Sequence, residues 1–205
     1  LYAELLLWLE LQRKNFYGAF IQARALDRKA QAPGNESLRI GRLAMQNEYW
    51  EDATTIFEYI QKEYDNTYNG LQAKKLLIES KEKAIKNEYP LDRIALQALA
   101  LDYQKLYDDQ GPNPTSLQAL RNKALIHAFY LDSKGLATET LDFVSKNKRS
   151  PNTLIAQCKL DLGDIYLLDD QPWESTLLYS QVEKSQKEST LGYLAKLKNA
   201  QLSYY

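Results

Sequence analysis

The chain has 205 residues, of which 44% are hydrophobic and 26% are charged, a balance that is ordinary for a soluble domain. Its formal net charge of −1 gives no electrostatic basis for binding nucleic acid or an anionic membrane. No apolar run approaches the roughly 18 residues that a membrane span needs. The single cysteine, Cys158, excludes an internal disulfide and a cysteine-based metal cluster. Valine is rare while Leu, Ala, Lys, Gln and Glu are abundant, and this composition predicts an all-helical protein.

Periodic apolar stretches separated by Pro and Gly predict about eleven helices. No proline falls inside a periodic stretch, where it would cost about 3 kcal/mol. Asn113 followed by Pro114 suits a helix cap with proline at the first helical position. The predicted helices are 1–13, 16–30, 35–47, 50–64, 68–87, 91–109, 115–132, 136–147, 152–168, 172–186 and 190–205.

The chain repeats itself when it is shifted by 122 residues. Gly41 then falls on Gly163 and Phe57 falls on Tyr179. Further along, Thr67 falls on Ser189 and Gly70 on Gly192, and the register holds without a gap. Two matched glycines and a matched small, aromatic and aliphatic series indicate a structural repeat.

A second pattern places a small residue before apolar residues at +4 and +7, which lie on one helical face. Its members are Ala19, Ala23 and Leu26; Ala53, Phe57 and Ile60; Ala137, Leu141 and Val144; Ser175, Tyr179 and Val182; and, more weakly, Ala95 and Leu99. Two antiparallel helices approach closely only where one of them presents no bulk. We therefore expect Gly163 to lack a side chain where Ser175 crosses from the paired helix, with Tyr166 and Tyr179 filling the space beside that contact.

These residues resemble the tetratricopeptide repeat (TPR) family, whose pattern has Leu-Gly and Tyr in the first helix and small and aromatic residues in the second. The matching residues are Leu162, Gly163, Tyr166, Ser175, Tyr179 and Val182, and earlier Ile40, Gly41, Ala53, Phe57 and Ile60. The resemblance implies an all-α fold, a right-handed α-α superhelix of antiparallel helix pairs forming one solenoid over 1–205. The units implied are about 1–33, 34–67, 68–112, 113–150, 151–188 and a half unit 189–205.

The resemblance also implies a concave surface, lined by the first helix of each pair, that binds a partner protein or peptide. In tetratricopeptide domains that clamp a carboxylate, the clamp positions correspond here to Leu38, Arg42, Asn122, Ile126, Leu160 and Asp164. Only Arg42 and Asn122 could donate, and they lie two units apart, so a clamp is not supported. The candidate partner-binding residues are Arg42, Gln46, Asn122, Asp164 and Gln201. The structural repeat positions are Gly41, Ala53, Phe57, Gly163, Tyr166, Ser175 and Tyr179.

The sequence assembles no catalytic or metal-binding set. His127 has no second histidine or cysteine at ligand spacing, and Cys158 is expected in the core. Asp161, Asp164 and their neighbours Asp169 and Asp170 are interpreted as solvated faces and loop caps rather than an acid/base pair. We therefore predict a non-enzymatic interaction scaffold without cofactor or metal. Two alternatives stay open: a tyrosine-lined solenoid binding a small ligand or polysaccharide, and an auxiliary domain of a larger envelope enzyme or assembly.

Two segments between the units bear on location. "KEYDNTYNGLQAK" and "EKSQKESTLGYLAK" resemble the tyrosine-rich linkers of bacterial envelope tetratricopeptide proteins, which implies a periplasmic or outer-membrane-associated protein, with a cytoplasmic location still open. The last helix looks like a first helix without its second, and should expose Leu197, Leu202 and Tyr205. We expect the chain to be truncated there, or another surface to cover this end, which allows self-association through the last helix.

Overall fold

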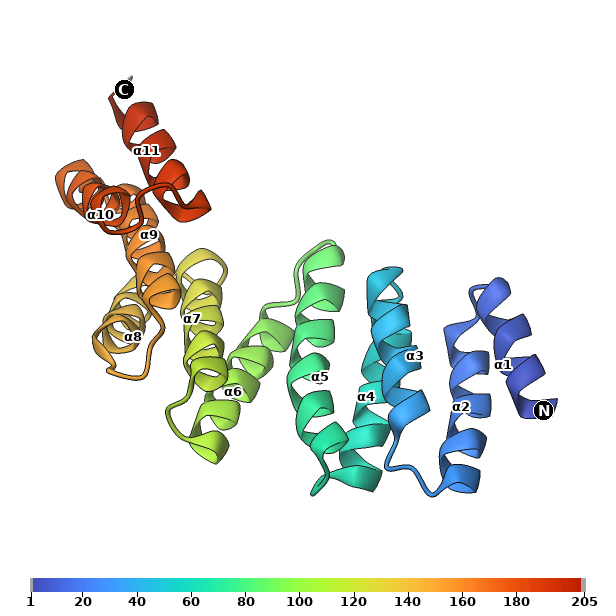
Figure 1. Ribbon diagram of the computed structural model, residues 1–205. Coiled ribbons are helices and arrows are strands. Elements are labelled where there is room, and N and C mark those ends of the chain that lie inside the picture. Colours follow the sequence, from blue (N-terminus) through green and yellow to red (C-terminus); the bar gives the residue numbers. More distant parts are fainter. Residues whose placement is uncertain (1, 204–205) are drawn as a thin grey trace. The chain divides into compact units, whose positions relative to one another are not determined.

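The computed structural model describes residues 2–203, and every regular element in that range is an α-helix (Figure 1), which confirms the all-α prediction. Helix α5 spans the predicted residues, whereas α7 ends at Phe129 rather than at 132. The helices are α1 (Tyr2–Gln12), α2 (Phe16–Ala30), α3 (Asn35–Gln46), α4 (Trp50–Tyr64), α5 (Tyr68–Asn87), α6 (Arg93–Gln110), α7 (Pro114–Phe129), α8 (Lys134–Lys146), α9 (Asn152–Leu168), α10 (Pro172–Ser185) and α11 (Thr190–Leu202).

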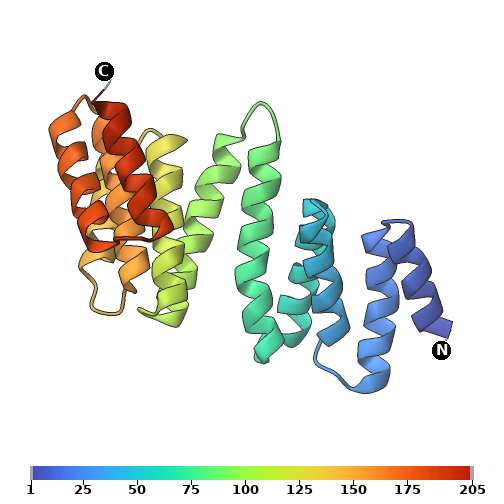
Figure 2. The ribbon, with the colours of Figure 1, turned by 45° about the horizontal axis from the view of Figure 1, so that its top comes forward.

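The chain divides into two compact units, Leu1–Asp92 (unit 1, with α1 to α5) and Arg93–Tyr205 (unit 2, with α6 to α11). Within each unit every helix packs against the next along the chain, and neighbours run in opposite directions (Figure 2). Helices two apart also touch: α3 contacts α5 in unit 1, and α9 contacts both α7 and α11 in unit 2. Each unit is therefore a stack of helix hairpins. The repeat boundaries given above stay a prediction.

The core of unit 1 consists of small residues alternating with large ones on α2, α3 and α4. Ala19, Ala23 and Ala53 are fully buried together with Phe57 and Ile60. Gly41 of α3 lies directly under the Phe57 ring, since a Cβ added there would sit 2.6 Å from Phe57 Cε1. The ring thus occupies the volume that any side chain at residue 41 would need.

The same arrangement recurs in unit 2 between α9 and α10. A Cβ on Gly163 would sit 2.3 Å from Tyr179 Cε1, and the Ser175 hydroxyl donates a 2.7 Å hydrogen bond to the Gly163 carbonyl oxygen. The tyrosine ring, rather than Ser175, is therefore the group that needs the glycine. Tyr166 packs with the α7–α9 core cluster, which also contains the buried Cys158, whereas Tyr179 belongs to the α9–α11 cluster.

The start of α5 and the start of α11 share one cap. Thr67 Oγ1 accepts from the Gly70 amide at 3.1 Å, and Ser189 Oγ accepts from the Gly192 amide at 3.1 Å. A Cβ on either glycine would lie within 2.2 Å of a carbonyl oxygen of the preceding turn. A hydroxyl cap with glycine three residues later thus lets the chain turn tightly into both helices. The residue pairs are those that the 122-residue shift aligned.

The last helix partly differs from the sequence-based expectation. Leu197 is 55% exposed, but Leu202 is half-buried and packs against the α9–α11 core cluster. The expectation that Leu202 would be exposed is therefore wrong, because α11 also contacts α9. Tyr205 lies outside the described residues.

Candidate functional site

One face of α3 carries a stripe of polar residues at helical spacing: Asn35, Arg39, Arg42 and Gln46, which we call the α3 stripe. Arg42 and Gln46, both candidates from the sequence, are exposed one turn apart. Arg39 forms an exposed ion pair with Glu36, with Nη2 and Oε2 2.8 Å apart. The stripe therefore offers guanidinium and amide donors to a partner along more than two turns of helix.

A groove of about 580 Å³ runs beside the α3 stripe, between α1 and α3. It forms because α1 packs against α2 alone, and no Cα of α1 lies within 8 Å of one in α3 among the described residues. Leu7 of α1 and Leu26 of α2 contribute apolar side chains to its lining, and charged residues come from all three helices. The lining residues are Glu4, Leu7, Leu26, Asp27, Lys29, Ala30, Ala32, Asn35, Glu36 and Arg39.

Asp27, in the wall of this groove, has a structural role. It is 1% exposed, and its carboxylate accepts from the Glu36 amide at 2.8 Å and the Ser37 amide at 3.0 Å. The Ser37 hydroxyl adds a third hydrogen bond of 2.7 Å. The carboxylate thus satisfies the free amides at the start of α3 and holds that helix against the end of α2. This fixes the direction of the α3 stripe.

The equivalent stripe on α9, 122 residues later, consists of Gln157, Asp161, Asp164 and Leu168. Asp161 is 9% exposed and makes a two-point ion pair with Arg121 of α7, with distances of 2.5 and 3.0 Å. Burial raises the pKa of Asp161, and the Arg121 guanidinium opposes that rise. The interpretation of Asp161 as a solvated carboxylate is therefore wrong. It is part of a partly buried ion pair that joins α7 to α9.

Asp164 makes the corresponding bridge in the other direction, to α11. Lys198 Nζ lies 2.7 Å from its Oδ1 and 2.9 Å from its Oδ2, and the Tyr179 hydroxyl donates to Oδ1 at 2.6 Å. A depression of about 320 Å³ beside this cluster also includes Gln201. The structure thus brings two of the candidate residues, Asp164 and Gln201, to one place. However, the carboxylate of Asp164 is already engaged within unit 2.

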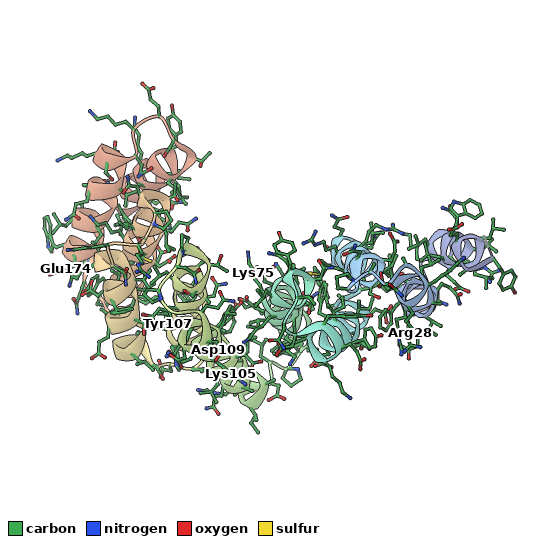
Figure 3. All side chains as sticks on the ribbon, turned by 60° about the horizontal axis from the view of Figure 1, so that its bottom comes forward. Arg28, Lys75, Lys105, Tyr107, Asp109 and Glu174 are labelled. Atoms are coloured by element: carbon green, nitrogen blue, oxygen red, sulfur yellow. The ribbon has the colours of Figure 1, made fainter. Side chains whose placement is uncertain are left out.

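Asn122 lies apart from these residues. Its amide nitrogen is 3.2 Å from the Tyr103 hydroxyl of α6, and its amide oxygen accepts from Gln118 at 3.0 Å. The residue beside it, Arg121, is the one that reaches α9. Sequence reasoning missed Arg121 and Lys198 because their partners are 40 and 34 residues away and no short motif links them. Tyr107 of α6, which Figure 3 labels, packs edge-on against Phe143 of α8, with ring centroids 6.1 Å apart.

Cys158 and His127, the nucleophilic and titratable residues of unit 2 considered above, have surroundings that suit a structural role. Burial raises the pKa of the Cys158 thiol to about 12, so the nucleophilic thiolate is scarce at neutral pH. Burial, with Lys123 nearby, lowers the pKa of His127, and its buried Nδ1 has no hydrogen-bond partner. Within residues 2–203, no three His, Cys, Asp or Glu side chains gather as a metal site would require. No helix in that range has the length and apolarity to cross a membrane.

Comparison with known proteins defines the fold. No protein-family model matches the sequence, and no curated protein matches it. Among solved structures, a thermophilic TPR protein of Thermus thermophilus superposes with a TM-score of 0.62 at 14% sequence identity, over 99% of this chain and 100% of that chain. The chain therefore has the fold of a tetratricopeptide-like α-solenoid. At this identity the likeness defines the fold alone.

Proposed function

We propose that this chain is a non-enzymatic scaffold that holds a partner protein or peptide against the first-helix face of unit 1. The observation that carries the proposal is the groove of about 580 Å³ between α1 and α3, whose lining includes Leu7, Leu26 and Arg39. Arg42 and Gln46 continue the α3 stripe beyond the groove. A segment with an apolar side chain and a neighbouring acceptor fits this surface, because the leucines bury the first and Arg42 binds the second.

Unit 2 supports placing the partner on unit 1. On α9 the charged positions of the stripe are paired with Arg121 and Lys198 from neighbouring helices. In unit 1 the position equivalent to Asp164 is the exposed Arg42 of α3. The position equivalent to Lys198 is the apolar Leu76 of α5. Arg42 of the α3 stripe is thus exposed where Asp164 of α9 is paired, although Asn35 of the stripe accepts a hydrogen bond from Asn69 of α5.

The chemical surroundings of Cys158 and His127 favour a scaffold over an enzyme, because a protonated buried thiol and an isolated histidine supply neither nucleophile nor proton relay. A location in the bacterial envelope rests only on the resemblance of the linker segments and stays a prediction.

The test begins with selection of binding peptides from a random peptide library on the wild-type chain. Titration calorimetry then compares the selected peptides on wild type, Arg42→Glu, and a matched control with the same charge change, Lys62→Glu on α4, which is exposed and outside the groove. We expect Arg42→Glu to weaken binding at least about tenfold, or about 1.4 kcal/mol, while Lys62→Glu has little effect. Selected peptides that bind Arg42→Glu as tightly as wild type would contradict the proposal.

A further inference from the structure

A hollow of about 290 Å³ in unit 1 lies between the turn that joins α3 to α4 and the last turn of α5, and we call it the acidic hollow. Its lining contains four acidic residues and no basic one: Glu48 in the turn, Glu51 and Asp52 at the start of α4, and Glu88 directly after α5. The start of α4 meets the end of α5 because the two helices pack against each other in opposite directions (Figure 2). Charge of a single sign therefore gathers around one cavity.

No carboxylate of the acidic hollow forms an ion pair with a lysine or arginine within residues 2–203. Burial raises the pKa of Asp52, and the neighbouring carboxylate of Glu51 raises it further, while a hydrogen bond from the Tyr17 backbone opposes the rise. Lys86, in the last turn of α5, pairs with Glu82 one turn earlier. The negative charge of the hollow is thus not neutralised by the helices that form it.

Two of these carboxylates lie where a helix end disfavours them. Helix α5 ends at Asn87, and Ala84 and Asn87 of its last turn also line the hollow, next to Glu88. Glu48 lies just beyond the end of α3. The last carbonyl groups of a helix lack intrahelical donors, and this end of the helix dipole is negative, so an anion there is unfavourable and a cation is favourable. The first turn of α4 accounts for its own two carboxylates, but not for Glu48 and Glu88.

Two aromatic residues complete the lining. Tyr49 is 41% exposed, and its ring packs against Phe16 of α2, with centroids 4.9 Å apart. Trp50 has a buried indole Nε1 without a hydrogen-bond partner among the described residues. Buried donors normally have acceptors, and a small shift of the ring would let a carbonyl oxygen of a bound segment supply one. Aromatic rings beside carboxylates are suited to a guanidinium group, which stacks on the rings and pairs with the carboxylates.

We propose that the acidic hollow holds an arginine side chain of a basic peptide segment, with the guanidinium group at Glu48 and Glu88 and the side-chain stem against Tyr49 and Trp50. A metal ion fits less well, because no three described His, Cys, Asp or Glu side chains gather closely enough to share one. The hollow shares no lining residue with the groove beside the α3 stripe, so this inference goes beyond the function proposed above and does not depend on it.

Titration calorimetry with an end-capped tri-arginine peptide tests the proposal, and a tri-citrulline peptide is the uncharged control of the same shape. Wild type should bind the arginine peptide, more weakly as salt is added, and should not bind the citrulline peptide. Glu48→Gln with Glu88→Gln should weaken binding at least about tenfold. Glu63→Gln with Asp65→Asn makes the same change of charge at exposed residues around the other end of α4, and should have little effect.

Urea unfolding separates a binding role from a structural one. The Glu48→Gln, Glu88→Gln variant should be at least as stable as wild type, because it removes negative charge from two helix ends. The proposal is overturned if wild type does not bind the arginine peptide, or binds the citrulline peptide as tightly. It is also overturned if the hollow variant keeps wild-type affinity or is less stable than wild type, or if the Glu63→Gln, Asp65→Asn control loses as much affinity as the hollow variant.

Discussion

Helices α3 to α5 of unit 1 and α9 to α11 of unit 2 have the same packing and different surface chemistry. In both, a glycine lies under an aromatic ring from the next helix, and in both a hydroxyl caps a helix that has glycine three residues later. The position occupied by Asp164 in unit 2 is Arg42 in unit 1. Packing depends on shape, which both copies keep. An exposed charge is constrained only by its neighbours, so it can reverse where those neighbours change.

The two units also differ in the contacts between helices that are two apart along the chain. In unit 2, Arg121–Asp161 joins α7 to α9 and Asp164–Lys198 joins α9 to α11. In unit 1, a groove separates α1 from α3, and Arg39 pairs only within its own helix, with Glu36. The same fold thus gives one unit in which ion pairs join helices two apart and one in which a hydrogen bond from Asn69 to Asn35 joins α5 to α3 while Arg42 stays exposed.

The largest expected effect comes from removing one member of the Arg121–Asp161 ion pair. Asp161→Ala leaves the Arg121 guanidinium, whose side chain is 18% exposed, without its counter-charge and should lower the free energy of unfolding by about 2 kcal/mol. At the equivalent position in unit 1, Arg39→Ala breaks an exposed pair and should cost less than about 0.5 kcal/mol. Urea unfolding followed by circular dichroism measures both. Equal effects of the two substitutions would remove the distinction between the units.

The next effect concerns the shared glycines. Gly163→Ala and Gly41→Ala each force a methyl group into an aromatic ring and should cost roughly 1–3 kcal/mol, despite the better helix propensity of alanine. Gly135 in α8 is the matched control, because a Cβ there meets nothing within 4 Å. Gly135→Ala should therefore stabilise by up to about 1 kcal/mol. The packing explanation fails if Gly163→Ala is as stable as Gly135→Ala in thermal unfolding.

A smaller effect should follow from making unit 2 resemble unit 1 at the ring. Tyr179→Phe keeps the packing over Gly163 and removes the hydrogen bond to Asp164, at an expected cost of about 1 kcal/mol. Tyr166→Phe is the control, since no hydrogen bond to the Tyr166 hydroxyl occurs among the described side chains, and it should change stability very little. Urea unfolding midpoints of the two variants provide the comparison. A larger loss for Tyr166→Phe would be inconsistent with the assigned role of Asp164.

The pH dependence should also separate the units, because the only histidine lies in unit 2. Burial lowers the pKa of His127 in the folded state, whereas an unfolded histidine has a pKa of about 6.5. As the pH falls below about 6.5, the unfolded chain therefore binds a proton at this residue more readily than the folded chain does. Stability from this group is therefore present above that pH and is lost as the pH falls below it. Wild type should lose more stability than His127→Leu between neutral pH and about pH 5. Parallel pH profiles of the thermal midpoint would show that His127 does not contribute.

The sequence by itself determined the helices and the places where they pack closely. Helix length, the positions of Pro and Gly, and the spacing of small and apolar residues are local properties, and the 122-residue shift aligned Gly41 with Gly163 and Phe57 with Tyr179. The spacing set Ser175 against Gly163, however, and only the tertiary structure placed the Tyr179 ring over that glycine. Leu202 was misjudged because its burial depends on α9, which is distant in sequence.

Only the tertiary structure decided which charges meet. Arg121 and Asp161 are 40 residues apart, and a shift of one residue along either helix would point them elsewhere. For the same reason the sequence could not show that Asn122, beside Arg121, is hydrogen-bonded to Tyr103 of α6, and its role in partner binding stays a prediction. Repeated packing is detectable in the sequence because every copy needs small and large residues at the same positions. A salt bridge between helices is not detectable in this way, since any oppositely charged pair at the right place can form it.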